Sequence, residues 1–254
     1  MIHIIGENII EQAQAFNDVR DALDFDHDVY LGAMWATPLG VELSDVAVYN
    51  MEPLYDDSPL FPEYLDTLKR CHVIDYCMSN VEYLKAKGVD AFYMPYGYHD
   101  KLSRRVKVKK DIDVLFVGSS HFERRQKVFK ELDKKVKFVL GQGVYGEDLD
   151  ILIGRAKVHL NVHHISSQQL EVVRLNYLLA NGCTVVSEYG KDQDVNDMYE
   201  HSLFFSDYED LVESCIYAIE NPIRQIGPIM KHDCTQANLW LNSRGEICQQ
   251  YLQQ

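Results

Sequence analysis

The sequence predicts an α/β protein built from two Rossmann-like domains that face each other across a cleft. Short apolar runs alternate with helix-length amphipathic segments in both halves of the chain, as in parallel sheets covered by helices. This alternation is interrupted once, by Pro95-Tyr96-Gly97-Tyr98 and the basic segment that follows it. We therefore expect an N-terminal domain at 1–98, a basic linker at 99–112, a second domain at 113–232 and a C-terminal helix at 233–254.

Hydrophobic periodicity places the individual elements. In the first domain, the expected strands are 2–5, 29–32, 46–49, 73–76 and 91–94, and the expected helices are 9–23, 63–70 and 80–87. In the second domain, the expected strands are 114–117, 136–140, 158–162, 183–186 and 203–206. The helices expected there are 123–132, 147–156, 167–181 and 208–220, and the tail from 235 to 254 is also expected to be helical.

Composition narrows the function classes. The net charge of −14 argues against a general binder of polyanions, although residues 101–137 carry 13 of the 25 Lys and Arg against five acids. The six cysteines show no CxxC pair and no metal-like spacing, so we expect reduced thiols, no metal and no cofactor. No signal-peptide signature is present, and no apolar run approaches the roughly 20 residues that cross a bilayer. We expect a cytoplasmic protein without a transmembrane segment.

The stretch from Lys157 to Gly190 contains a strand, a helix and a second strand in that order. In such a βαβ unit, both strand ends and the helix N-terminus lie at one edge of the sheet. The helix N-terminus has free N–H groups and a partial positive charge, so it can bind an anion such as a diphosphate without a metal. His163 follows the first strand and Glu188 ends the second, which makes this edge the expected site of the chemistry.

Segments in both halves resemble GT-B fold glycosyltransferases of the group 1 type. Residues 113–119 (DVLFVGS) are similar to the opening strand and glycine turn of their donor-binding C-terminal domain. Residues 174–188 are similar to the donor helix and following strand, 207–222 to the closing helix, and 94–98 to the Pro-x-Gly signature that ends the N-terminal domain. The resemblance covers about half of the chain. It implies a small GT-B-like enzyme that transfers a sugar from a nucleotide sugar, expected to be UDP-linked, to an acceptor hydroxyl.

The chain departs from this family at one position. Many retaining members carry a Glu five residues before the helix-stopping glycine, where it binds the donor ribose, and here that residue is Tyr177. Either Glu171 or Glu188 is then expected to supply the carboxylate. For Glu188, the alternative is a simple turn carboxylate.

Sugar transfer requires that charge on the leaving diphosphate be neutralised, that the sugar be oriented and that water be excluded. The candidates for the diphosphate are the Gly118-Ser119-Ser120 turn, Arg124 or Arg125, and Arg174, because an arginine can bind phosphate oxygens at two points. Arg174 is alternatively a surface residue paired with Glu171.

Two side chains of the strand before the donor helix are also candidates. His163 is expected to bond the transferring sugar or its phosphate, and the alternative is a strand-end histidine bonded to backbone. Asn161 is a weaker candidate for a donor contact.

The first domain offers candidates for the acceptor side. Glu7 and Glu52 follow predicted strands, and either carboxylate can act as a base toward the acceptor hydroxyl if the reaction inverts. Asn50, Tyr96 and Tyr98 are expected to contact the acceptor. The structural alternatives are turn formation by Asn50 and packing by the two tyrosines.

A saccharide or glycan is the default acceptor. The basic residues at 101–137 also suit a phosphate backbone, so a DNA glycosyltransferase acting on a flipped-out hydroxymethylated base is an alternative. A catalytically silent nucleotide-sugar binder is another. The sequence contains no P-loop, G-x-S-x-G or G-x-G-x-x-G motif, and its five D-x-D matches are expected by chance in an Asp-rich chain. The oligomeric state is left open.

Overall fold

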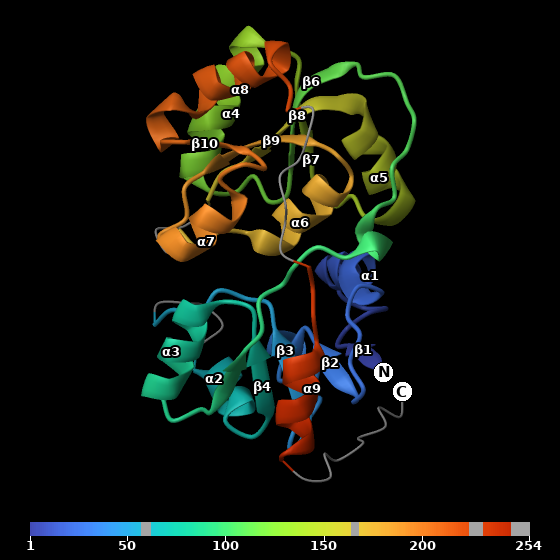
Figure 1. Ribbon diagram of the computed structural model, residues 1–254, viewed down its shortest axis with the longest axis vertical. Helices are drawn as coiled ribbons and strands as arrows, with labels where there is room; N and C mark the ends of the chain where they lie inside the picture. Colours follow the sequence, from blue (N-terminus) through green and yellow to red (C-terminus); the bar gives the residue numbers. More distant parts are fainter. Residues whose placement is uncertain (57–61, 164–167, 224–230, 245–254) are drawn as a thin grey trace. The chain divides into compact units, whose positions relative to one another are not determined.

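The computed structural model describes residues 1–56, 62–163, 168–223 and 231–244 (Figure 1). The chain divides into two compact units. Unit 1 consists of Met1–Tyr96 and His232–Gln254, and unit 2 consists of Gly97–Lys231. Each unit contains its own parallel sheet, which confirms the predicted α/β class with two Rossmann-like parts.

Unit 1 contains a five-stranded parallel sheet in its described part, with the strands in sequence order β1-β2-β3-β4-β5. The strands are β1 (Ile2–Ile4), β2 (Val29–Leu31), β3 (Ala47–Asn50), β4 (His72–Asp75) and β5 (Ala91–Tyr93). Residues of β2 and β3 are buried throughout, as expected for central strands of a parallel sheet covered on both faces. All five carboxyl ends therefore lie at one edge of this sheet.

The helical elements of unit 1 are η1 (Glu11–Ala13), α1 (Gln14–Arg20), η2 (Ala33–Trp35), α2 (Glu63–Leu68), α3 (Met78–Ala86) and α9 (Thr235–Asn242). Helix α9 comes from the far end of the chain and packs beside β5. Its Trp240 ring lies 5.4 Å from the Phe92 ring of β5, measured between centroids. Asn238 of α9 also accepts the Asp26 backbone N–H at 3.1 Å.

Unit 2 also has a five-stranded parallel sheet, but its strand order is β10-β9-β8-β6-β7. The strands are β6 (Ile112–Val117), β7 (Phe138–Gly141), β8 (Ala156–Asn161), β9 (Thr184–Glu188) and β10 (Phe204–Ser206). The chain moves outward from β6 to β7, returns to β8 on the other side of β6, and continues to β9 and β10. The order therefore reverses between β6 and β8, and ligands of open α/β sheets bind at such a reversal.

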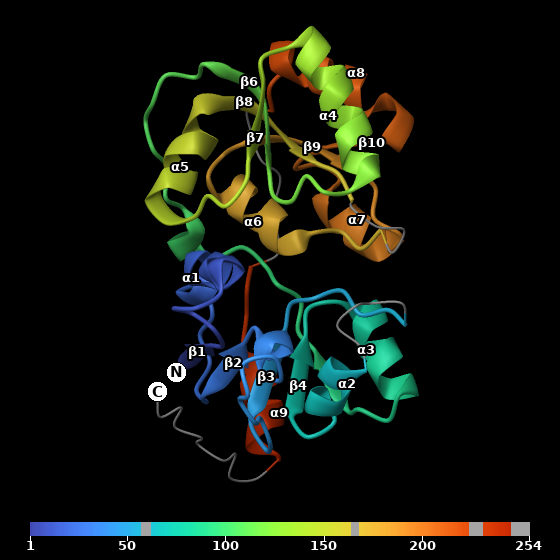
Figure 2. The ribbon, with the colours of Figure 1, turned by 180° about the vertical axis from the view of Figure 1, so that it is seen from behind.

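Helices cover both faces of this second sheet. They are α4 (Glu123–Lys135), α5 (Gly146–Arg155), α6 (Val172–Ala180), α7 (Gln193–Tyr199) and α8 (Leu211–Glu220), with the short helices η3 (Asp100–Leu102) and η4 (Tyr208–Asp210). Figure 2 shows α4 and α8 side by side on one face, and α5 and α6 lie on the other (Figures 1 and 2). No helix in the described ranges has the length and apolar content that a membrane span requires.

The basic segment that was predicted as a linker lies in unit 2 and is fixed to it by hydrogen bonds. Asn181, just after α6, accepts the Arg104 backbone N–H at 2.8 Å and donates to the Leu102 carbonyl at 2.9 Å. Further along, Gly154 of α5 lets the chain approach closely. A Cβ added at this glycine would lie 2.9 Å from the Val106 carbonyl oxygen.

The expected strands are confirmed with shifts of one or two residues at their ends, but two helix predictions were wrong at the start. The helix expected from Ile9 begins at Glu11 with a 3₁₀ turn, because Gly6 adopts a φ of +74° and its carbonyl accepts two later N–H groups. The helix expected over 167–181 begins at Val172, after Gln168 at a φ of +49°. Ser167 and the tail after Arg244 lie outside the described residues.

We predict that Gly154→Ala destabilises unit 2. Alanine normally stabilises a helix by about 1 kcal/mol relative to glycine. Here the added methyl would lie 2.9 Å from the Val106 carbonyl oxygen, so segment 104–108 must shift. We expect the free energy of unfolding to fall by about 1–2 kcal/mol, measured by urea denaturation. Ile151→Ala on the exposed side of the same helix is the control and should change it little. A more stable Gly154→Ala variant would contradict the close packing.

Candidate functional site

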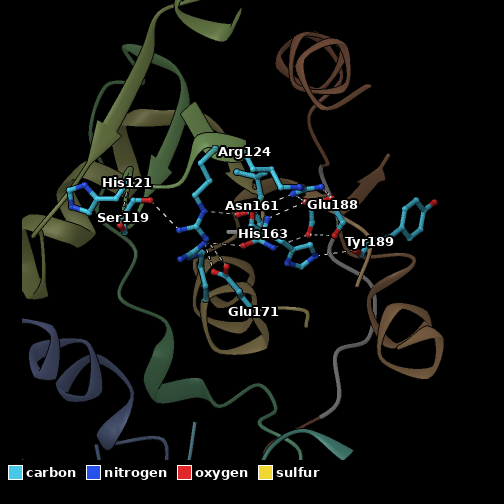
Figure 3. A network of polar contacts seen from close by, with 12 residues as sticks. Ser119, His121, Arg124, Asn161, His163, Glu171, Glu188 and Tyr189 are labelled. Carbon is cyan, nitrogen blue, oxygen red and sulfur yellow. Dashed lines mark hydrogen bonds and ion pairs between the residues drawn. The ribbon is translucent and has the colours of Figure 1, made fainter. Parts of the chain in front are cut away.

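The candidate site lies in unit 2, at the carboxyl edge of its sheet, where the strand order reverses. Strand β6 ends at Val117 and is followed by the Gly118-Ser119 turn, and β8 ends at Asn161 and leads to His163. Strand β9, the other neighbour of β8, ends with Glu188. Because the three strands are parallel, these ends meet at one edge. Figure 3 shows the polar contacts among the side chains at this edge.

Gly118 determines how the chain leaves β6. Its φ is +138°, in the range that favours glycine, and its N–H donates to the Gly141 carbonyl at 2.9 Å. A Cβ at this position would lie 3.1 Å from Nη2 of Arg174. The glycine therefore lets the turn approach the arginine closely.

Arg125 is buried below this turn and bonds three separate segments. Its Nη1 donates to the Ser119 carbonyl at 3.1 Å, and its Nε donates to the Val162 carbonyl at 2.9 Å. Its Nη2 donates to Oε1 of Glu171 at 2.8 Å. The guanidinium also lies over the Phe116 ring, 4.8 Å from its centroid. Burial lowers the pKa of Arg125 to about 10, so it stays charged at neutral pH.

Arg124 and Glu188 form a two-point ion pair beside it. Arg124 Nη1 donates to Glu188 Oε2 at 2.6 Å, and Nη2 contacts the other carboxylate oxygen. The guanidinium also lies over the Tyr208 ring, with its carbon 3.9 Å from the centroid. The hydrogen bonds to Glu188 raise the pKa of Arg124 above its ordinary value.

His163 is attached to the same ion pair through its backbone. Its N–H donates to Glu188 Oε2 at 3.1 Å, and its carbonyl accepts from Arg124 at 3.2 Å. The imidazole Nε2 lies 3.0 Å from the Tyr189 carbonyl oxygen, so the ring can donate there as the Nε2–H tautomer. The residue is 2% exposed. This is the backbone-bonded arrangement that the sequence left as the alternative.

Arg174 projects from the first turn of α6 toward the glycine turn. Its Nη1 bonds Oε2 of Glu171 at 2.5 Å and Oδ1 of Asn161 at 3.0 Å. Its guanidinium lies 5.2 Å from the centroid of the Phe116 ring. Asn161 in turn donates to Ser187 Oγ at 3.0 Å. Arg174 thus contacts both Glu171 and a buried strand-end amide, which fixes its direction.

The structure brings together eight of the candidates that the sequence placed in the second domain: Gly118, Ser119, Arg124, Asn161, His163, Glu171, Arg174 and Glu188. Ser120 instead donates to the Gln142 side chain at 3.0 Å. The pairing of Arg124 with Glu188 was not expected, since nothing in the sequence links positions 64 residues apart. Arg125 was named only as an alternative to Arg124, and its burial distinguishes the two.

Tyr177, which replaces the ribose-binding Glu of the resemblance, faces a different neighbour. Its hydroxyl donates to Asp150 of α5, and the ring is buried. Glu171 and Glu188 are the carboxylates present among the arginines. Among the described residues, no group of three or more His, Cys, Asp or Glu side chains is arranged to bind a metal ion.

The candidates from the first half of the sequence are divided between the two units. Glu7 pairs with Arg20 in unit 1, and Glu52 lies in the turn after β3. Tyr96 is 1% exposed, with its ring 5.2 Å from that of His232. Tyr98 belongs to unit 2, where its hydroxyl donates to Asp100 at 2.8 Å.

A buried polar cluster at the carboxyl edge of sheet 1 was missed. Asp75 ends β4 and is completely buried, and it accepts hydrogen bonds from Asn50 at 2.6 Å, Asn80 at 3.1 Å and the Cys77 N–H at 2.8 Å. The Tyr64 hydroxyl donates to Asn50 Oδ1 at 2.7 Å. Burial raises the pKa of Asp75 to about 8, against the lowering effect of these hydrogen bonds.

This pKa predicts a pH-dependent stability of unit 1. Between about pH 4, where Asp75 ionises in the unfolded chain, and its native pKa of about 8, the folded state binds more protons. Stability should therefore fall as the pH rises through this window, by at most about 1.4 kcal/mol per pH unit from this group, and level off above it. Urea denaturation at pH 5, 7 and 9 measures the effect. Asp75→Asn should flatten the slope, and an unchanged slope would contradict the raised pKa.

Comparisons with known proteins support the fold. No family model matches the chain. Uncharacterized protein L140 of Acanthamoeba polyphaga mimivirus is 26% identical over 186 residues, which cover 68% of this chain and 60% of that protein. The crystal structure of TarM aligns with a TM-score of 0.50 and 11% identity, over 93% of this chain and 58% of TarM. The chain thus spans less than two thirds of both proteins.

WaaG, a glycosyltransferase involved in lipopolysaccharide biosynthesis, aligns with a TM-score of 0.50 and 10% identity. The alignment covers 89% of this chain and 74% of WaaG. At these identities the likeness concerns the fold, and it agrees with the two parallel sheets and with the strand reversal in unit 2. The resemblance seen in the sequence is confirmed at this level: the chain has the GT-B fold of glycosyltransferases.

Proposed function

We propose that this protein is a glycosyltransferase that transfers a sugar from a nucleotide-diphosphate donor to an acceptor hydroxyl. The observation that carries the proposal is the group of three guanidinium groups around the Gly118 turn, at the strand reversal of a GT-B fold. Arginine and backbone N–H groups at this position suit the diphosphate of a nucleotide sugar.

Arg174 and the Gly118 turn are the proposed diphosphate contacts. Nη2 of Arg174 lies close to Gly118. Its positive charge is therefore beside backbone that a phosphate can approach, because glycine has no side chain to block it. In sugar transfer, negative charge grows on the diphosphate as the glycosidic bond breaks, and fixed positive groups stabilise it most in the transition state. Arg124 is the third proposed contact, and its pairing with Glu188 orients it before the donor binds.

Glu171 and Glu188 have two proposed roles. Each neutralises part of the arginine charge in the absence of donor, which limits repulsion among the guanidinium groups. Each also offers carboxylate oxygens to ribose or sugar hydroxyls. Tyr177, at the position of the family's ribose-binding Glu, cannot do this because its hydroxyl contacts Asp150. Because arginines supply the positive charge, the proposal requires no metal or other cofactor.

Asn161, the last residue of β8, and His163, two residues later, support the site. The hydrogen bonds of His163 to Glu188 and Tyr189 favour a positioning role for this residue, and its direct participation in catalysis stays a prediction. Asn161 orients Arg174 in the same way.

On the acceptor side, we take Glu52 as the catalytic base, because it lies in the turn after the central strand β3, at the carboxyl edge of sheet 1. Glu7 follows the edge strand β1 and is paired with Arg20. Asn50 is buried and bonded to Asp75, so its role is internal to unit 1. Acceptor contacts by Tyr96 and Tyr98 stay predictions.

A saccharide or glycan remains the proposed acceptor class. Several basic side chains of the 101–137 segment are paired with acids, which leaves less charge for a DNA backbone than the composition implies. These are Lys127 with Glu123, Lys134 with Glu131, Lys135 with Glu213, and Lys137 with Asp111. No contact in the described residues favours hydroxymethylated DNA, so we do not propose it.

The test is incubation of the purified protein with UDP-, GDP- and ADP-linked sugars, alone and with saccharide and hydroxymethylated-DNA acceptors, followed by mass spectrometry. Release of nucleoside diphosphate and addition of a sugar mass to a saccharide are expected, with and without EDTA. Donor binding without any turnover would instead identify a catalytically silent binder. A complete loss of turnover in EDTA would contradict the metal-independent mechanism.

We predict that Arg174→Met lowers kcat/KM for the donor by about 100-fold, because it removes a charged contact that strengthens in the transition state. The matched control is Arg155→Met, since Arg155 is also ion-paired, to Asp111 at 2.8 Å, but lies at the amino edge of the same sheet. Its kcat/KM should stay within about twofold of the wild-type value. Equal losses in both variants would indicate a general effect of charge and contradict the proposed contact.

A further inference from the structure

The hydrogen bonds of Asp75 in unit 1 fix the orientation of two neighbouring asparagine side chains. Both carboxylate oxygens of Asp75 act as acceptors: Oδ2 accepts from Asn50 at 2.6 Å, and Oδ1 accepts from the Cys77 N–H at 2.8 Å. Asn80 donates to both oxygens at 3.1 Å. The ionised side chain offers two acceptor oxygens in this way. The protonated acid, which prevails below the pKa of about 8, adds one O–H donor and keeps acceptor capacity on its oxygens. The amide groups of Asn50 and Asn80 must therefore present their nitrogen atoms to Asp75.

This orientation sends the amide oxygens of both asparagines toward the turn after β3. Asn50 Oδ1 accepts the Glu52 N–H at 3.1 Å, and Asn80 Oδ1 accepts the Leu54 N–H at 3.0 Å. The second hydrogen of each amide nitrogen is also used. Both nitrogens donate to the Glu52 carbonyl, at 2.9 Å from Asn50 and 2.8 Å from Asn80. The backbone of Glu52 is thus bonded through its N–H and its carbonyl.

The turn at 51–54 lies at the carboxyl edge of sheet 1, where an α/β sheet places its ligands. Three backbone groups of the turn, the N–H and carbonyl of Glu52 and the N–H of Leu54, use side chains from β3 and α3 as partners. The orientation of those side chains depends in turn on one buried acid at the end of β4. The arrangement therefore links Asp75 to the position of Glu52.

We propose that Asp75 is a positioning residue of the acceptor side, which fixes the turn carrying Glu52 through the amide orientation of Asn50 and Asn80. This inference rests on the proposed glycosyltransferase function, in which Glu52 faces the acceptor hydroxyl. Replacing Asp75 by Asn removes one acceptor oxygen and adds two N–H donors. An N–H group of the new amide then faces the amide nitrogen of Asn50 or Asn80, which is also a donor. That asparagine must rotate, and it loses its hydrogen bond to the turn.

Hydrogen exchange tests the structural half without any substrate. In Asp75→Asn, the amide protons of Glu52 and Leu54 should exchange about tenfold faster than in the wild type at the same pH. The control is Asp28→Asn, because Asp28 precedes β2 at the opposite edge of the sheet and bonds His3 at 3.1 Å. Asp28→Asn should leave exchange at 52 and 54 unchanged. Unchanged exchange in folded Asp75→Asn would overturn the inference.

Steady-state kinetics tests the functional half, with the acceptor identified by the donor and acceptor panel. In Asp75→Asn, kcat/KM for the acceptor should fall about tenfold, while KM for the donor and acceptor-independent donor hydrolysis change less than about twofold. A parallel loss of all three quantities, or faster exchange with unchanged acceptor kinetics, would reduce Asp75 to a structural residue. If Asp75→Asn does not fold, Asn80→Ala serves instead, with faster exchange expected at Leu54.

The two proposals fail in distinguishable ways. If the wild-type protein transfers no sugar, the glycosyltransferase function is overturned, together with the acceptor-side role of Asp75. The exchange experiment still decides whether Asp75 controls the turn. If the wild-type protein transfers sugar but Asp75→Asn does so with unchanged kinetics, only the positioning role is lost.

Discussion

The buried guanidinium of Arg125 is the contact on which the arrangement of the candidate site depends. It joins the turn after β6, the end of β8 and the residue before α6, through Ser119, Val162 and Glu171. Removing a charge from water costs several kcal/mol unless partners replace the lost hydration. For Arg125, the lost hydration is replaced by the Glu171 carboxylate, two backbone carbonyls and the Phe116 ring. The more exposed arginines on either side can then bind a ligand while the loops below them stay in place.

The two sheets have carboxyl edges of different chemical character. In unit 2, guanidinium groups dominate and are matched by two carboxylates, an arrangement suited to an anionic ligand. In unit 1, Asp75, Asn50 and Asn80 form a neutral or singly negative cluster that is directed at the backbone of its own turn. In the proposed function, the arginines of unit 2 bind the phosphates of the donor, and the cluster in unit 1 fixes the turn that carries Glu52.

Much of the candidate site could be predicted from the sequence. In a parallel sheet, the polar residues that follow apolar strands lie at the same edge. Gly118, His163 and Glu188 were located in this way. The start of α6 was not located, because the tertiary contact of Glu171 with Arg125 acts on a residue that local periodicity assigns to the helix. Asp75 was missed because the apolar run was extended through Tyr76, which placed the acid inside a strand rather than at its end.

The sequence could not predict which arginine pairs with which glutamate, for a different reason. Arg124 and Arg125 are adjacent and chemically identical, yet one is buried and the other half-exposed, because α4 turns them toward different strands. Only the packed helix decides which arginine meets Glu171 and which meets Glu188. Sequence spacing carries no such information for partners that are far apart along the chain.

Unit 1 is composed of the first 96 residues and a segment from the other end of the chain. Helix α9 supplies Trp240 against β5, and Asn238 bonds the backbone on both sides of Phe25. During synthesis on the ribosome, the strands of unit 1 emerge first, but their covering helix emerges only after all of unit 2 has been translated. The strands of unit 1 are therefore translated before unit 2, but unit 1 is completed only after it, and the β5 surface lacks α9 until then.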